Sequence, residues 1–89
     1  MEGEWNMNTA AMQMNELVTQ IARSLVDSPQ DVRVNAIEGN HTTVLELCVA
    51  KEDIGKVIGR QGRTAQAMRT LIAAVSAKFK KRTVLEIVE

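Results

Sequence analysis

The part of this chain best suited to chemistry is residues 57–63, which read VIGRQGR. Two glycines at GxxG spacing, Gly59 and Gly62, stand among two arginines, and no acidic residue lies close by. A glycine lets the main chain approach a ligand because it has no Cβ, and the first amides of a following helix attract anions. Backbone and positive charge together predict a phosphate-binding loop.

Charge is divided unevenly along the chain, although the formal net charge is zero. Residues 1–53 carry three basic and nine acidic residues, whereas residues 54–82 carry eight basic residues and no acidic one. A net charge of zero alone argues against a nucleic-acid partner. The basic second half reverses that argument, because a local positive field attracts phosphate. We interpret the basic run at residues 78–82 as a solvated helix end that only supports this field.

Length and composition fit one small domain, with 89 residues of which 45% are hydrophobic and 25% charged. The single cysteine, Cys48, allows no internal disulfide, so we expect a reducing, cytoplasmic location. No apolar run approaches the roughly 20 residues of a membrane helix, so we expect no membrane contact. His41 stands alone and no nucleophile has a base beside it, so we expect no enzyme, metal or small-molecule cofactor.

Hydrophobic periodicity predicts a helix near the N-terminus. Apolar residues recur every three or four positions in residues 17–26, with Asn15 as a plausible N-cap. The helix must end by Ser28, because the residue before a proline avoids the helical region. Residues 1–13 lack a convincing period, so we expect a flexible extension there and a single domain over residues 14–89.

The remaining elements follow in an order that defines the fold. Alternating residues 32–36 and 43–49 predict a β-hairpin, and residues 51–58 predict a short helix stopped by Gly59. A longer helix follows the loop, and residues 83–88 alternate as a last strand. The order α-β-β-α-α-β predicts an α+β two-layer sandwich, with a three-stranded sheet and three helices on one face. The side chains expected to form or flank the buried face of the longer helix are Ala65, Met68, Leu71, Ile72, Val75 and Phe79.

The motif IGKVIGRQGR, residues 54–63, resembles the KH domain in its prokaryotic, type II arrangement. Residues 25–32 and 67–70 also resemble that family, at a helix end and in its second helix. Residues 14–88 are similar to one such domain with nothing left over. The chain therefore resembles the small stand-alone bacterial KH-domain RNA-binding proteins (the KH-domain protein A family), from which the N-terminal extension departs.

This resemblance implies a GxxG loop that clamps about four nucleotides of single-stranded RNA. Gly59 and Gly62 would let the backbone approach the phosphates, while Arg60 and Gln61 would contact phosphate or sugar. The other residues expected at this site are, for the positive field, Lys56, Arg63 and Arg69 and, for an apolar groove that holds bases, Ile54, Val57 and Ile58. Which of the three apolar residues face the groove, and which the core, stays open.

Aromatic residues are nearly absent, since Trp5 and Phe79 are the only two. Recognition by stacked rings is therefore nearly excluded, and one module should bind RNA with modest affinity. We expect a homodimer, or a heterodimer with a larger KH-containing RNA-binding protein. The resemblance further implies an RNA chaperone or post-transcriptional regulator linked to cell length and cell-wall synthesis. The alternative is a protein–protein interaction adaptor, favoured by the zero net charge and the acidic N-terminal half.

Overall fold

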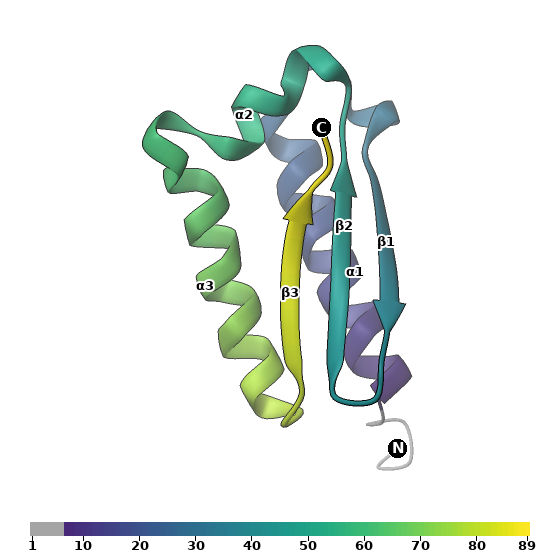
Figure 1. The fold of residues 1–89 in the computed structure, drawn as a ribbon. Coiled ribbons are helices and arrows are strands. Elements are labelled where there is room, and N and C mark those ends of the chain that lie inside the picture. Colours follow the sequence, from purple (N-terminus) through teal and green to yellow (C-terminus); the bar gives the residue numbers. More distant parts are fainter. Residues whose placement is uncertain (1–6) are drawn as a thin grey trace.

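The computed structural model describes residues 7–89 and shows two layers, a three-stranded sheet with helices packed on one face (Figure 1). The predicted α+β class and the α-β-β-α-α-β order are confirmed. The helices and strands are α1 (Met7–Leu25), β1 (Arg33–Glu38), β2 (Thr42–Cys48), α2 (Ile54–Ile58), α3 (Arg63–Lys78) and β3 (Arg82–Ile87), with single 3₁₀ turns at Pro29–Asp31, Lys51–Asp53 and Arg60–Gly62.

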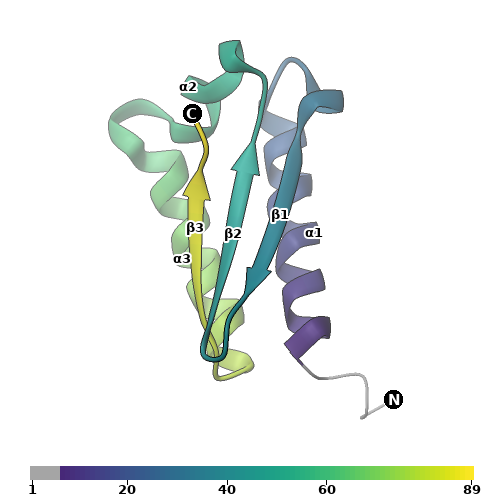
Figure 2. The same cartoon turned by 45° about the vertical axis from the view of Figure 1, so that its right-hand side comes forward.

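The sheet is mixed, with β2 between the two edge strands β1 and β3. β1 and β2 form the predicted antiparallel hairpin, in which Val34 lies opposite Leu47. β2 and β3 are parallel, with Leu45 opposite Leu85. A parallel pair cannot be joined by a tight turn and needs a crossover. Here α2 and α3 form that crossover and run beside β3 (Figure 2), so the GxxG loop falls between two helices.

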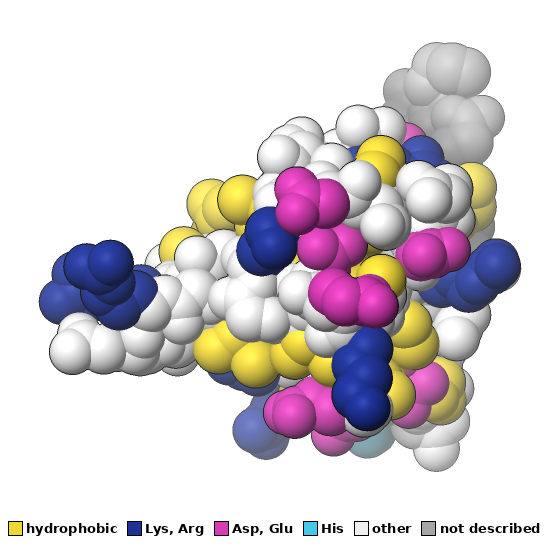
Figure 3. Space-filling model, turned by 90° about the horizontal axis from the view of Figure 1, so that it is seen from above, with side chains coloured by type: hydrophobic (Ala, Val, Ile, Leu, Met, Phe, Trp, Pro, Cys, Tyr) yellow, Lys and Arg dark blue, Asp and Glu magenta, His cyan; other side chains and the backbone are white. Residues whose placement is uncertain are grey.

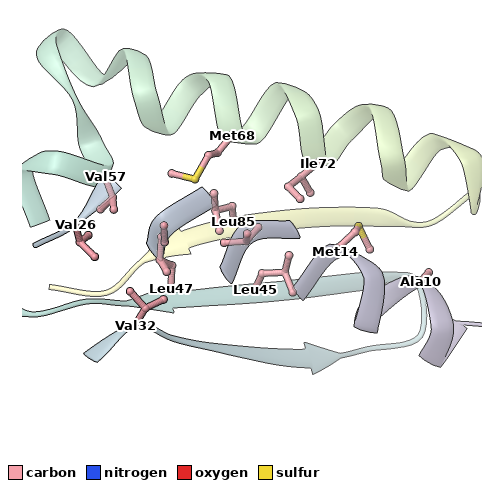
Figure 4. Close-up of a cluster of buried hydrophobic side chains, with 12 residues drawn as sticks. Ala10, Met14, Val26, Val32, Leu45, Leu47, Val57, Met68, Ile72 and Leu85 are labelled. Atoms are coloured by element: carbon pink, nitrogen blue, oxygen red, sulfur yellow. The ribbon is translucent and has the colours of Figure 1, made fainter. Parts of the chain in front are cut away.

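The core fills the space between the sheet and the helices (Figure 4). Leu25, which was expected in the buried stripe of the first helix, is instead 38% exposed, and Leu71, which was expected beside the buried face of the longer helix, is 49% exposed. Leu25 is the last residue of α1. On α3 the buried positions continue from Ile72 to Ser76 at four-residue spacing, and Leu71 lies beside this stripe. The largest fully buried apolar side chains are Met14, Val18, Leu45, Leu47, Val57, Met68 and Ile72.

The start of α1 differs from the sequence prediction. The helix begins at Met7, so the prediction of Asn15 as its N-cap was wrong. Ala10 is only 1% exposed and joins Met14 in the core, which continues the buried stripe at four-residue spacing. Residues 1–6 of the expected extension lie outside the described residues, and the division of the chain into extension and domain stays a prediction.

Three further features bear on function. Within the part of the chain that the structure describes, no helix is long and apolar enough to cross a membrane. The same part holds no group of three or more His, Cys, Asp or Glu side chains that could bind a metal ion. Cys48 is a half-buried free cysteine.

Candidate nucleic-acid interface

The loop between α2 and α3 has an unusual backbone. Three of its four residues have positive φ angles: 80° at Gly59, 57° at Gln61 and 73° at Gly62. The Gly59 N–H donates to the Gly55 carbonyl at 2.9 Å, and the Gly62 N–H donates to the Gly59 carbonyl at 3.1 Å. Main-chain hydrogen bonds therefore set the shape of the loop and leave the side chains of Arg60 and Gln61 exposed to solvent.

The two glycines are required for different reasons. A Cβ on Gly59 would lie 2.7 Å from the Cβ of Thr64 and 2.8 Å from its backbone nitrogen, closer than real side chains approach. A Cβ on Gly62 would have no atom within 4 Å. Gly59 thus satisfies both a steric and a backbone requirement. Gly62 satisfies only the backbone requirement, and the space beside it is open to a ligand.

The start of α3 concentrates positive charge. Arg60 and Arg63 are both exposed, and within residues 7–89 no acidic side chain lies within 4 Å of either guanidinium. The N-cap, Gly62, has no side chain to accept a helix N–H, and the first turn of α3 holds no acidic residue. A positive charge at a helix N-terminus is unfavourable by about 0.3–1 kcal/mol. An anion bound here would relieve that repulsion.

The end of the molecule that carries α2 is divided by charge. Figure 3 shows basic side chains gathered on a projection, which is the α2–α3 junction of Figure 1, whereas the acidic side chains lie on the main body together with further Lys and Arg side chains. White atoms, which are the backbone and other side chains, lie directly between the two groups, and an apolar strip runs below them. The uneven charge of the sequence thus appears in space as a basic loop without acidic side chains beside a body that carries the acidic ones.

Lys56 belongs to the acidic side of this division, although it was expected to strengthen the field of the loop. Its ammonium nitrogen lies 3.3 Å from Asp27 Oδ2 and 3.6 Å from Asp53 Oδ1. The hydrogen bond and the charge of Asp27, more than those of Asp53, raise the pKa of Lys56. Because two carboxylates compensate its charge, Lys56 contributes less to the loop's field than Arg60 or Arg63.

The apolar residues of α2 separate into core and surface. Val57 has no exposed surface and packs in the core, so its place among the expected groove residues does not agree with the structure. Ile54 and Ile58 are half-buried. Half-buried Ile87 is in β3, whose C-terminal end lies beside α2 (Figures 1 and 2). The sequence left open which of the three apolar residues face the groove. In the structure, Ile54 and Ile58 have accessible side-chain surface that a base could contact.

Arg69 lies on α3, two turns after the loop, and is tied to the sheet. Its Nε donates a hydrogen bond to the Leu85 carbonyl at 3.3 Å, on the outer edge of β3. This hydrogen bond joins α3 to β3 at the edge of the sheet opposite β1. Arg69 thus combines an exposed cationic group with a structural hydrogen bond.

The basic run at the C-terminal end of α3 lies far from the loop. α3 has 16 residues, so its two ends are separated by about 24 Å, well beyond the screening length of about 8 Å at physiological salt. Lys80 and Arg82 are exposed, as predicted for a solvated helix end. Lys81 is not, because only 6% of it is accessible.

Asp53 is a residue whose importance the sequence did not reveal. It was expected to be an ordinary acid in the first turn of a helix, but it is 2% exposed. Its carboxylate accepts hydrogen bonds from the backbone N–H groups of Asp27 and Ser28. The sequence signal is weak, since Glu52 beside it differs only in side-chain length. Asp53 anchors the start of α2 and therefore the position of the loop.

The mixed three-stranded sheet, the α-β-β-α-α-β order and the GxxG loop between the crossover helices define a type II KH domain. Comparison with known proteins narrows this class. The family model described as "KhpA/KhpB, KH domain" matches residues 15–87. The chain belongs to the KhpA family of KH-domain proteins, a non-enzymatic family, in agreement with the prediction that it is not an enzyme.

Several curated relatives are similar over most of their length. RNA-binding protein KhpA of Caldanaerobacter subterraneus subsp. tengcongensis is 56% identical over 75 residues, which cover 84% of this chain and all of the relative. The protein of the same name from Aquifex aeolicus is 49% identical over 76 residues, 85% of this chain and 96% of the relative. That from Chlamydia pneumoniae is 47% identical over 76 residues, 85% and 97% of the two chains.

A crystal structure of Aquifex aeolicus Era bound to GDP.AlF4- has the same fold in part of its chain. The superposition gives a TM-score of 0.59 at 18% sequence identity and covers 86% of this chain and 30% of the Era chain. At this identity the likeness supports the type II KH fold alone.

Proposed function

We propose that this protein is a non-enzymatic, single-stranded RNA-binding protein that holds the RNA backbone at residues 59–62, the GRQG loop. The observation that carries the proposal is the pair Arg60 and Arg63, exposed and without an acidic partner among residues 7–89, at a helix N-terminus that no side chain caps. The relatives named RNA-binding protein KhpA support the same function.

The loop geometry suits a phosphodiester chain. Open space beside Gly62 admits the RNA backbone, while Arg60 and Gln61 reach phosphate or sugar oxygens and Arg63 adds positive charge. Ile54 and Ile58 offer half-buried apolar surface to the bases. Residues 54–63 contain no aromatic side chain on which a base could stack. Binding therefore depends on backbone contacts and apolar packing, which give loose sequence preference.

The wider role is proposed on the family resemblance. One small module binds modestly, and a second module raises affinity through effective concentration. We therefore propose a homodimer, or a heterodimer with a larger KH-containing protein, and the family description, which names KhpA and KhpB together, supports the second form. The proposal extends to a cytoplasmic RNA chaperone or post-transcriptional regulator that affects cell length and cell-wall synthesis.

The test compares two variants with equal changes of charge. Arg60→Glu/Arg63→Glu reverses charge at the loop, and Lys80→Glu/Arg82→Glu does so at the far end of α3. Fluorescence anisotropy with a short, labelled, single-stranded RNA of mixed sequence should show binding weakened at least about tenfold in the loop variant only. For the loop variant, the slope of log K against log salt concentration should become shallower by about 0.7 for each phosphate that the variant no longer neutralises. Equal weakening in both variants contradicts the loop assignment, and unchanged binding in both favours the adaptor alternative.

A further inference from the structure

The outer side of β1 offers unpaired backbone groups. β1 is an edge strand, and the hairpin ladder begins at the bond from the Gly39 N–H to the Thr42 carbonyl, 2.7 Å long. Hydrogen-bonded and non-hydrogen-bonded pairs alternate along an antiparallel ladder. From this register, every second residue of β1 directs its N–H and C=O away from β2. These residues are Val34, Ala36 and Glu38.

Part of this edge is already covered by α1. The side-chain amide of Asn15 donates a hydrogen bond to the Val34 carbonyl at 3.0 Å, which agrees with the register. Among residues 7–89, no corresponding side-chain bond reaches the outward groups of Ala36 or Glu38. An edge strand with free N–H and C=O groups is a template for another strand.

A groove opens where the edge is uncovered. Its volume is about 470 Å³, and it lies between the N-terminal half of α1 and the second half of β1. Met12 on its rim is 71% exposed, an unusual position for a large apolar side chain. The lining residues are Ala11, Met12, Asn15, Glu16, Ala36 and Glu38. Apolar surface and free strand backbone therefore stand side by side.

The acidic side chains of the groove favour a positively charged segment as its ligand. Among the residues whose side chains the structure describes, Glu16 and Glu38 line it, no basic residue does, and neither carboxylate has an ion pair. Residues 1–6 of this chain contain two glutamates and no Lys, Arg or His, so they lack a basic side chain to complement this charge. A second copy joined edge to edge would bring its own Glu38 to the same acidic groove. Charge complementarity favours a basic segment from another protein.

We propose that this groove, lined by α1 and the free edge of β1, binds an extended basic segment of a partner protein, which adds to the sheet as a fourth strand. Side chains two positions apart on a strand share a face. An apolar side chain would pack against Ala11 and Met12, and a lysine or arginine two positions away would meet Glu16 and Glu38. This is strand addition, a common form of peptide recognition.

The groove and the GRQG loop can be occupied together. β1 and α3 lie at opposite edges of the sheet, and the N-terminal half of α1 lies at the end of the molecule away from α2 (Figure 1). The inference does not rest on RNA binding. It adds to the proposed function a separate surface by which a partner protein and RNA could be held at the same time.

The test is a titration of the ¹⁵N-labelled protein with a capped peptide, Thr-Val-Thr-Lys-Thr, and with a second peptide that has Glu in place of Lys. The first peptide should shift the amide signals of Ala36 and Glu38 and slow their hydrogen exchange, and the second should do neither. No shift at millimolar peptide overturns the proposal, as does a shift confined to the GRQG loop.

Two pairs of variants separate strand addition from general attraction. Ala36→Pro removes the outward N–H at a position where an edge strand tolerates proline, and Ala36→Ser keeps it, so only the first should abolish binding. Glu38→Lys should weaken binding about fivefold, while the same change at Glu86, on the opposite edge strand, should not. Equal effects within the Glu38 and Glu86 pair overturn the proposal even if Ala36→Pro fails to fold.

Discussion

The carboxylate of Asp53 accepts a hydrogen bond from the backbone N–H of Ser28 at 3.0 Å, across 25 residues of sequence. Its other oxygen accepts from the Asp27 N–H at 3.3 Å. The connection that leaves α1 is thereby fixed to the start of α2. α2 has only five residues, and Val57 is the one that is buried in the core. The position of the GRQG loop therefore depends on this buried aspartate.

Replacing Asp53 with alanine should destabilise the domain. The change removes the charged acceptor of two part-buried backbone N–H groups, and a hydrogen bond to a charged group contributes about 1.5–3 kcal/mol. We expect urea denaturation to show a decrease in stability of that size. Glu52→Ala is the control, because Glu52 is exposed and its removal should change the free energy of unfolding by less than about 0.5 kcal/mol. Similar values for the two variants contradict the anchoring role of Asp53.

The two glycines of the loop should respond differently to alanine. Gly62→Ala meets no neighbouring atom, so it should cost only the strain of a left-handed residue, about 1–2 kcal/mol. Gly59→Ala adds overlap with Thr64 to the same strain and should cost roughly 2–5 kcal/mol. Thermal or chemical denaturation of both variants measures the difference. If Gly62→Ala destabilised the protein as much as Gly59→Ala, or more, the loop would have another shape in solution.

Lys56 should give the stability a distinct dependence on pH. Its pKa is raised above the ordinary 10.5, chiefly by Asp27, so the folded state holds the proton more tightly than the unfolded state. The stabilisation is then fully present below pH 10.5 and is lost as the pH rises through the raised value. Wild type should be more stable than Lys56→Met at pH 7, and the difference should shrink above pH 10.5. Lys51→Met, a change of an exposed lysine nearby that has no ion pair among the described residues, is the control and should alter the free energy of unfolding at pH 7 by less than about 0.5 kcal/mol.

The features that could be predicted from the sequence are the local ones. The spacing of the glycines and the neighbouring arginines predicted the loop, because residues that are adjacent in the sequence determine both its turn geometry and its charge. Val57 could not be assigned to the core, since a helix of five residues is too short for periodicity to reveal a face. The role of Asp53 could not be seen either, because its partners lie 25 and 26 residues away.

The start of α1 was missed for a related reason. The buried residues of its first turns, Ala10 and Ala11, are small and give a weak amphipathic signal. Asn15 looked like an N-cap because its side chain often accepts a helix N–H. In the structure the same amide donates to the Val34 carbonyl on β1, a tertiary contact that periodicity cannot predict.

Two truncations locate the functional start of the domain. Deleting residues 1–6 keeps the whole of α1 (Met7–Leu25) and gives the reference form, whereas deleting residues 1–13 also removes Ala10 and Ala11, which are 1% and 7% exposed. At about 0.8 kcal/mol for each buried methyl, the longer deletion should lower the free energy of unfolding by about 1–2 kcal/mol. It also removes two residues that line the groove beside β1, so it should weaken the basic peptide while leaving RNA affinity unchanged. Equal stability of the two truncated forms would instead support a flexible extension that reaches residue 13.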